Sequence, residues 1–160
     1  MSYSIQAKID GLDEMQKAFK QAPQIVNRNM KDAIGKAAFF AEGKAKSYAP
    51  VRSGALRGSI TAEGPRGSGL EIEAKVGTNL KYAPHQEYGT GIYGKSSSLI
   101  TPKRAKTLAW KQNGKWIFAK AVRGVQGKFY FKKSKSETMP FLNDVVKGAL
   151  ANITRFLAKG

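Results

Sequence analysis

Residues 26–40, VNRNMKDAIGKAAFF, give the strongest structural signal in the sequence, because their apolar residues recur at the period of an α-helix. Val26, Met30, Ala33, Ala37 and Phe40 follow one another at spacings of four, three, four and three residues, which places them on one side of a helix. The alanines leave room for a neighbouring element to approach closely. We therefore predict a helix that packs along this side, either in the core or at a subunit interface.

The predicted helix continues to about Tyr48 and ends before Pro50, because a residue that precedes proline avoids helical backbone angles. At 1.5 Å per residue, about 25 residues make a rod of roughly 37 Å. On the N-terminal side, residues 12–19 form a shorter helical stripe that is expected to be interrupted near Pro23. Residues 3–9 alternate between apolar and polar types, which predicts a strand before the helices.

The middle of the chain has the two-residue period of β-strands. Residues 56–62 and 70–76 alternate, and GPRGSG between them predicts a turn, so we expect a hairpin. A second hairpin is predicted in TLAWKQNGKWIFAK, residues 107–120, where Asn113 and Gly114 suit the positive angles of a two-residue turn. Its large aromatic residues are expected to cover one another or a partner: Trp110, Trp116 and Phe118.

Two basic stretches without periodicity, residues 91–107 and 124–138, are predicted to be loop insertions. The last helix is expected to begin at Thr138 as its cap, with Pro140 in the first turn. Apolar residues then recur every four positions over residues 141–157. This order of elements predicts an α+β fold with an antiparallel β-sheet, one long helix in the N-terminal half, a C-terminal helix and long basic loops.

The composition is that of a folded domain with an unusual excess of positive charge. Hydrophobic residues make up 41% of the chain and charged residues 24%, so we expect residues 1–160 to form a single domain. Lys and Arg total 28 against 11 Asp and Glu, a net charge of +17. Such an excess indicates an acidic partner, whether nucleic acid, a membrane surface or a protein, or else a solvated basic surface.

The sequence contains no cysteine and one histidine, which limits the chemistry that it can support. Disulfides and thiolate metal sites are excluded, and a zinc or two-metal site would be hard to assemble. No apolar run approaches the ~20 residues that span a bilayer, and the start, MSYSIQAKID, does not resemble a signal peptide. We expect no cofactor, no metal and no membrane contact, and a protein made and used in the cytoplasm.

EYGTGIYGKSS, residues 87–97, contains the G-x-G-x-x-G spacing of a dinucleotide-binding loop in Gly89, Gly91 and Gly94. Such a loop needs an apolar strand before it and a helix after it, so that helix amides meet the phosphate. Here the preceding YAPHQEY is polar and the following KSSSLITPK contains three serines and a proline. The spacing of a P-loop is not met either, so we predict no nucleotide site.

His85 and Glu87 are the strongest catalytic candidates, because a histidine two residues from a carboxylate could pair with it in a loop. A nucleophile, however, needs a base that is oriented by a third group, and an oxyanion site. Nothing in the sequence marks which serine would serve. We therefore predict a surface or interface histidine and a protein that is not an enzyme.

Three stretches of the chain, in this order, resemble the signature of a tailed-bacteriophage family. They are SYAPVRSGALRGSI (residues 47–60), KYAPHQEYGTG (residues 81–91) and MPFLNDVV (residues 139–146). The family is that of the small neck and tail-completion proteins grouped around the gene-ten tail component of lambdoid phages. Residues 101–125 are also similar to the hairpin that its members often have before the final helix.

The resemblance implies that EYGTG is a structural turn, in which Gly89 and Gly91 take angles closed to other residues and Glu87 accepts bonds from turn amides. It further implies a structural virion protein of the head–tail junction, made in the host cytoplasm and assembled as a homo-oligomeric ring, a hexamer or a dodecamer. The expected partners are the portal, adaptor or stopper proteins and the tail tube or terminator proteins.

Candidate contact residues lie around the turn and in the two basic stretches. The interface candidates are Tyr82, Glu87, Tyr88, Phe129, Tyr130 and Phe131, of which the last three form either aromatic anchors or ordinary edge-strand packing. The candidate basic contacts are Lys95, Lys103, Arg104, Lys106, Lys128, Lys132, Lys133 and Lys135.

Two other functions remain open from the sequence. Aromatic residues among lysines in KFYFKKSK, residues 128–135, are typical of nonspecific nucleic-acid binding, and the basic surface could touch DNA that passes through a channel. A tail terminator subunit would also be a small α+β ring protein.

Overall fold

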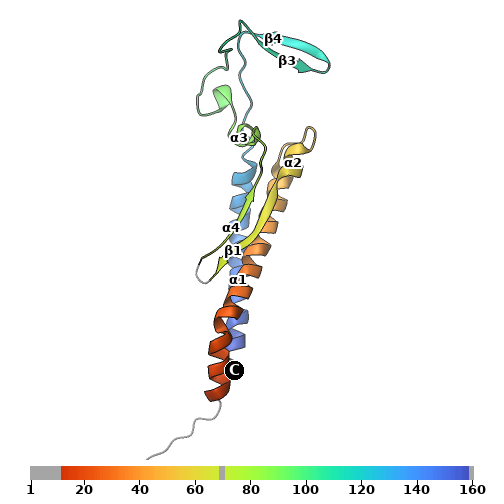
Figure 1. Cartoon of the computed structure of the whole chain (residues 1–160). Helices are drawn as coiled ribbons and strands as arrows, with labels where there is room; N and C mark the ends of the chain where they lie inside the picture. The colour runs from red at the N-terminus through yellow and green to blue at the C-terminus, as the bar shows by residue number, and fades with distance from the viewer. Residues whose placement is uncertain (1–11, 69–70, 159–160) are drawn as a thin grey trace, which may run out of the picture. The chain divides into compact units, whose positions relative to one another are not determined.

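A computed structural model describes residues 12–68 and 71–158 of the chain. The order of elements, most of which are labelled in Figure 1, is α1 (Leu12–Tyr48), α2 (Ala55–Ser59), β1 (Thr61–Ser68), β2 (Glu71–Gly77), α3 (Ala83–Tyr88), the 3-10 turn η1 (Gly91–Tyr93), β3 (Leu108–Gln112), β4 (Lys115–Ala119) and α4 (Tyr130–Leu157). β1 and β2 form one small antiparallel sheet, and β3 and β4 form another. The predicted α+β class, with a long helix in the N-terminal half and a C-terminal helix, is confirmed. The strand predicted at residues 3–9 lies outside the described residues.

The chain divides into two compact units that interleave along the sequence. Unit 1 comprises residues 1–39, 63–75 and 139–160, and unit 2 comprises residues 40–62 and 76–138. Helices α1 and α4 contribute residues to both units.

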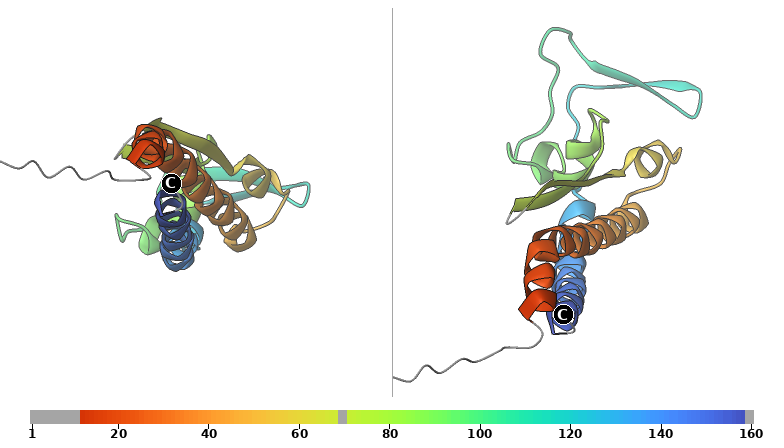
Figure 2. Two further views of the ribbon diagram at one scale, coloured as in Figure 1. Left: turned by 90° about the horizontal axis from the view of Figure 1, so that it is seen from below. Right: turned by 60° about the horizontal axis from the view of Figure 1, so that its bottom comes forward.

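Unit 1 is built on α1 and α4, which lie side by side (Figure 2). Their buried residues are mostly small: Ala33, Ala37, Ala38, Ala149 and Ile153. Ala33 and Ala37 belong to the stripe that the sequence predicted, and their small side chains let the two backbones approach closely. Pro65 of β1 packs on the same helix, 3.7 Å from where a Cβ on Gly35 would lie.

Unit 2 has the larger core, built around Tyr130 at the start of α4. Its buried members come from four helices and from the residues directly after α1 and α2: Ala45, Ala49, Leu56, Ile60, Ala83 and Tyr130. Val76, Leu80 and Phe131 pack against this core. The Ser134 hydroxyl of α4 donates to the Ala41 carbonyl of α1 over 2.7 Å, which fastens the two helices within the unit.

The first helix is longer than the sequence predicted. The expected interruption near Pro23 is wrong, because α1 runs from Leu12 to Tyr48 with the proline inside it. A proline removes one backbone hydrogen bond and can kink a helix without ending it. The predicted end before Pro50 is confirmed.

The first predicted hairpin is wrong in its first strand. Residues 55–59 form helix α2, and β1 begins only at Thr61 and continues through most of the predicted turn to Ser68. Leu56 and Ile60, which are both buried, are four residues apart, and that spacing fits a helix as well as a strand. The second strand is confirmed, since β2 alternates between exposed and half-buried residues.

The second hairpin is confirmed. Leu108 pairs with Ala119 and Gln112 with Lys115, which leaves Asn113 and Gly114 as the turn. Their φ angles of 49° and 80° are the positive values that a two-residue turn of this type requires.

The predicted loop at residues 124–138 is wrong beyond Phe129, because α4 begins at Tyr130. Thr138 is therefore not the helix cap. Its hydroxyl donates to the Ser134 carbonyl within the helix, over 2.8 Å, and Pro140 also lies inside α4.

Candidate assembly interface

The G-x-G-x-x-G stretch lies in unit 2, where its backbone passes against the segment that leads into α4. A Cβ on Gly91 would come within 2.2 Å of the Arg123 carbonyl oxygen, and a Cβ on Gly124 within 2.3 Å of the Thr90 oxygen. A Cβ on Gly89 would likewise meet the backbone at Gly127, and a Cβ on Gly127 would meet the backbone at Glu87. We call Gly89, Gly91, Gly124 and Gly127 the glycine crossing.

Backbone hydrogen bonds hold the two segments of the glycine crossing together. The Thr90 N–H donates to the Val125 carbonyl over 2.8 Å, and the Ile92 N–H donates to the Arg123 carbonyl over 3.0 Å. The φ angles of Gly89 and Gly91 are 82° and 63°, so the expected turn with positive angles is confirmed. These glycines serve a close approach of backbone to backbone.

Glu87 forms hydrogen bonds with the start of α4. Its carboxylate is buried at 4% exposure and accepts hydrogen bonds from the N–H groups of Phe131 and Lys132, at 2.9 and 3.0 Å. These amides belong to the first turn of α4, where helix N–H groups have no partner within the helix and the helix dipole favours negative charge. Glu87 is therefore a hydrogen-bond acceptor, as expected. Its donors are amides of α4, however, so the expectation that the amides of the turn itself donate is wrong.

A second set of polar contacts joins α1 to α4 within unit 2. The Glu137 carboxylate accepts a hydrogen bond from the Tyr48 hydroxyl and pairs with the Lys44 Nζ at 2.7 Å. The hydrogen bond from Lys44, followed by that from Tyr48, holds the pKa of Glu137 below its ordinary value. The Lys133 Nζ lies 5.9 Å from the centre of the Tyr48 ring.

Only some of the aromatic candidates are accessible. Tyr130 is fully buried, and its hydroxyl donates to the Ala83 carbonyl over 3.4 Å. Burial raises the pKa of Tyr130 to about 12, because the phenolate would lose its solvation. The Phe131 ring packs against Tyr130, with 4.7 Å between the ring centres. Neither of these two rings is presented as an anchor, and both belong to the packing of unit 2.

The other aromatic candidates remain exposed: Tyr82, Tyr88 and Phe129. Tyr82 lines an open groove of about 460 Å³ together with Arg52, Gln86 and the loop before α2. Phe129 has a positive φ of 53°, directly before α4, and the Lys132 Nζ lies 5.9 Å from its ring centre.

All eight candidate basic residues are exposed and all belong to unit 2. Unit 2 contains 17 of the 28 Lys and Arg residues but only three of the 11 carboxylates, so its net charge is +14 and that of unit 1 is +3. Each of the three carboxylates already has a partner within the unit: Glu42 with Lys46 and the Ala62 N–H, Glu87 with α4, and Glu137 with Lys44 and Tyr48. Most of the positive charge of unit 2 is therefore not balanced by carboxylates of the same unit.

The β3–β4 hairpin presents aromatic residues that the list of interface candidates did not include. Trp116 and Phe118 are 63% and 65% exposed, and their rings stack with 6.4 Å between centres and 26° between planes. Alternation along KWIFA places both on one face, and both are among the aromatic residues expected from the sequence to cover one another or a partner.

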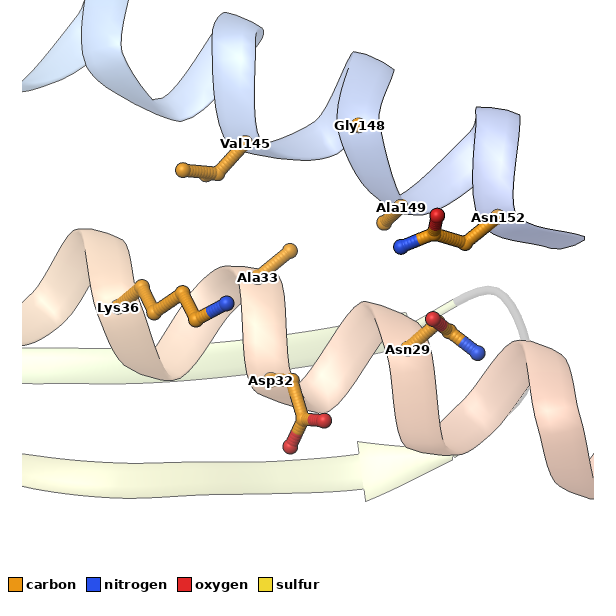
Figure 3. Close-up of a pocket in the computed structure, with 8 residues that line it drawn as sticks. All are labelled: Asn29, Asp32, Ala33, Lys36, Val145, Gly148, Ala149 and Asn152. Atoms are coloured by element: carbon orange, nitrogen blue, oxygen red, sulfur yellow. The ribbon is translucent and has the colours of Figure 1, made fainter.

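Unit 1 contains a smaller groove between α1 and α4, of about 260 Å³ (Figure 3). Val145, Gly148, Ala149 and Asn152 line it from α4, and Asn29, Asp32, Ala33 and Lys36 line it from α1. Among the described side chains, no three from His, Asp and Glu gather as a metal site. Within the same ranges, no helix combines the length and the apolar character needed to cross a bilayer.

Comparison with known protein families gives a match over the part of the chain from α1 to α3. Neither the curated proteins nor the solved structures gave a match. Two of the three stretches noted in the sequence, around residues 47–60 and 81–89, fall within the part that the family model covers. Over residues 13–89 the chain matches the family described as "Bacteriophage HK97-gp10, putative tail-component", and the suspected resemblance to the phage gene-ten tail components is thereby confirmed.

Proposed function

We propose that the protein is a structural part of the virion that sits at the head–tail junction and completes the tail or neck. The observation on which this rests is the match of residues 13–89 to a phage tail-component family. The matched part reaches from α1 to Gly89 and includes most of the buried core of unit 2. A structural family also agrees with the prediction that the chain is not an enzyme.

In this proposal several copies assemble as a ring around the tail axis, as a hexamer or a dodecamer, and join the portal, adaptor or stopper side to the tail tube or terminator side. A ring requires two different, complementary surfaces on each copy. Because unit 2 and unit 1 are both net positive, at +14 and +3, the contacts between copies in this proposal come from packing and hydrogen bonds and not from opposite net charges. A tail terminator subunit, the alternative role at this junction, would also assemble as a ring of this kind.

The test is a stop codon placed early in the gene, followed by electron microscopy of the lysate. We expect filled heads beside separate, finished tails, because heads and tails assemble independently when only the joining protein is lacking. Expression of the intact chain from a plasmid should restore joined particles. Normal infectious particles without the chain would contradict the proposal.

Nonspecific nucleic-acid binding is the second candidate, and the concentration of +14 in unit 2 favours it. Affinity for DNA that falls steeply with salt would show only the expected effect of charge. Stoichiometric binding at physiological salt, together with normal particles from the stop-codon phage, would favour this function over the first.

A further inference from the structure

The β3–β4 hairpin of unit 2 carries two strongly exposed aromatic residues, Trp116 and Phe118, on one strand. In its register Trp116 stands opposite Lys111 and Phe118 opposite Ala109, so these four residues share one face of the hairpin. The two rings stack on each other and remain 63% and 65% exposed.

The other face of the hairpin borders an open, mainly apolar groove of about 450 Å³. Its walls include Ile100, Leu108, Trp110, Val122 and Val125. A two-stranded hairpin has little stability of its own and normally packs against another element. Here both faces still offer apolar surface, as in an element that is completed by binding.

The charge around the hairpin indicates which kind of molecule completes it. Between Glu87 and Glu137 the sequence has twelve Lys and Arg and no Asp or Glu, and this interval includes the whole hairpin. The three carboxylates of unit 2 are already bonded within the unit. A second copy of the chain offers no net compensating charge, since its unit 1 is also net positive at +3. The partner must therefore be acidic.

The apolar surface of the hairpin favours a protein over a nucleic acid. The ring pair alone does not decide between them, because rings whose centres lie 6.4 Å apart leave faces open to a base as well as to a protein side chain. Two apolar faces on one hairpin suit a groove in a protein, which can cover both, and large aromatic residues are the usual anchors of such contacts.

We propose that the β3–β4 hairpin docks, through Trp116 and Phe118, into an acidic surface of another virion protein. This inference rests on the proposed function, because it takes the partner from the same particle. Aromatic anchoring supplies affinity, and the surrounding lysines orient the encounter.

The test is photo-crosslinking in purified particles that contain the variant Phe118→p-benzoylphenylalanine. The matched control is the same substitution at Phe39, which is 68% exposed and belongs to unit 1. We expect position 118, and not position 39, to crosslink to a different virion protein, within a segment where Asp and Glu outnumber Lys and Arg. Crosslinks to a second copy, to DNA or to no molecule would overturn the inference.

A second experiment separates this inference from the proposed function. The variant Trp116→Ala/Phe118→Ala should keep the thermal midpoint of the wild type, because both rings are exposed, but its incorporation into particles should fall about tenfold or more. If the wild-type chain is present in particles and the double variant enters them normally, only the docking inference fails. If the wild-type chain is itself absent from particles, the proposed function fails and the inference with it.

Discussion

At the scale of single residues, Tyr130 contributes most to the core of unit 2. Its ring is fully buried, and its hydroxyl makes one long hydrogen bond to Ala83. We expect Tyr130→Ala to lower the free energy of unfolding by about 3–5 kcal/mol and Tyr130→Phe by about 1 kcal/mol or less. Urea denaturation measures both. Tyr88→Ala, at a residue that is 66% exposed, is the control, and equal effects at both positions would contradict the assignment of Tyr130 to the core.

Glu137 should make the stability of the protein depend on pH in the acid range. Its pKa in the folded state lies below the ordinary value of 4.5, chiefly because Lys44 and then Tyr48 donate to it. A lowered folded-state pKa stabilises the protein above the unfolded pKa, and this contribution is lost as the pH falls through the folded value. Glu137→Gln should therefore lower the thermal midpoint at pH 7, and this difference from the wild type should shrink as the pH falls through the lowered pKa of Glu137.

The control for Glu137→Gln is Asp144→Asn, at an exposed carboxylate in the same helix. Thermal melts from pH 7 to pH 3 compare the two variants with the wild type. A difference between wild type and Glu137→Gln that does not shrink on acidification would show that the ion pair is not its source.

At the scale of elements, the start of α4 depends on Glu87. Its carboxylate caps the Phe131 and Lys132 amides, so Glu87→Gln should lower the free energy of unfolding by about 1–3 kcal/mol. Hydrogen exchange at those two amides should accelerate more than exchange in the middle of α4. Glu71→Gln, on the exposed side of β2, is the control. Unchanged exchange at both amides would rule out the capping role.

The glycine crossing should tolerate no side chain. Gly91→Ala places a Cβ 2.2 Å from the Arg123 oxygen in a backbone with φ of 63°, and should lower the free energy of unfolding by about 2 kcal/mol or more. Gly148→Ala is the matched control, because nothing lies within 4 Å of its Cβ and alanine favours the helix. Chemical denaturation of the two variants measures both free energies of unfolding. If Gly91→Ala is as stable as Gly148→Ala, the close approach at the crossing is not required.

Elements with a local signal were predictable from the sequence. The apolar stripe of α1 and the Asn113–Gly114 turn of the second hairpin both depend on residues that are neighbours in sequence, and both predictions are confirmed. The start of α4 was missed because its cap, Glu87, lies 44 residues before Phe131 in the chain. α2 was missed because Leu56 and Ile60 fit the periods of helix and strand equally well.

The exposure of the candidate contact residues was predictable only in part, for the same physical reason. Exposed lysines are identified from charge alone, and all eight candidates are exposed. Burial is a property of the folded unit, so the sequence could not separate Tyr130 in the core from Phe129, which is 41% exposed.

At the scale of the whole molecule, the uneven charge should steer assembly. We expect Lys132→Gln/Lys133→Gln/Lys135→Gln to reduce incorporation into particles about tenfold at low salt, and less at high salt. The control Lys20→Gln/Lys147→Gln/Arg155→Gln removes the same charge from exposed residues of unit 1. Quantitative blotting of purified particles compares the two. Equal losses of incorporation in the two variants would contradict the prediction, because they would show that the net charge of the chain, and not the position of the lysines, governs assembly.

The most direct measurement of the proposed role is cryo-electron microscopy of the head–tail junction in purified particles, combined with immunoblotting of those particles. The proposal predicts that the chain is present and that copies of it form a closed ring around the axis where head and tail meet. Purified, infectious particles that contain none of the chain, or contain it only away from this junction, would contradict the proposal.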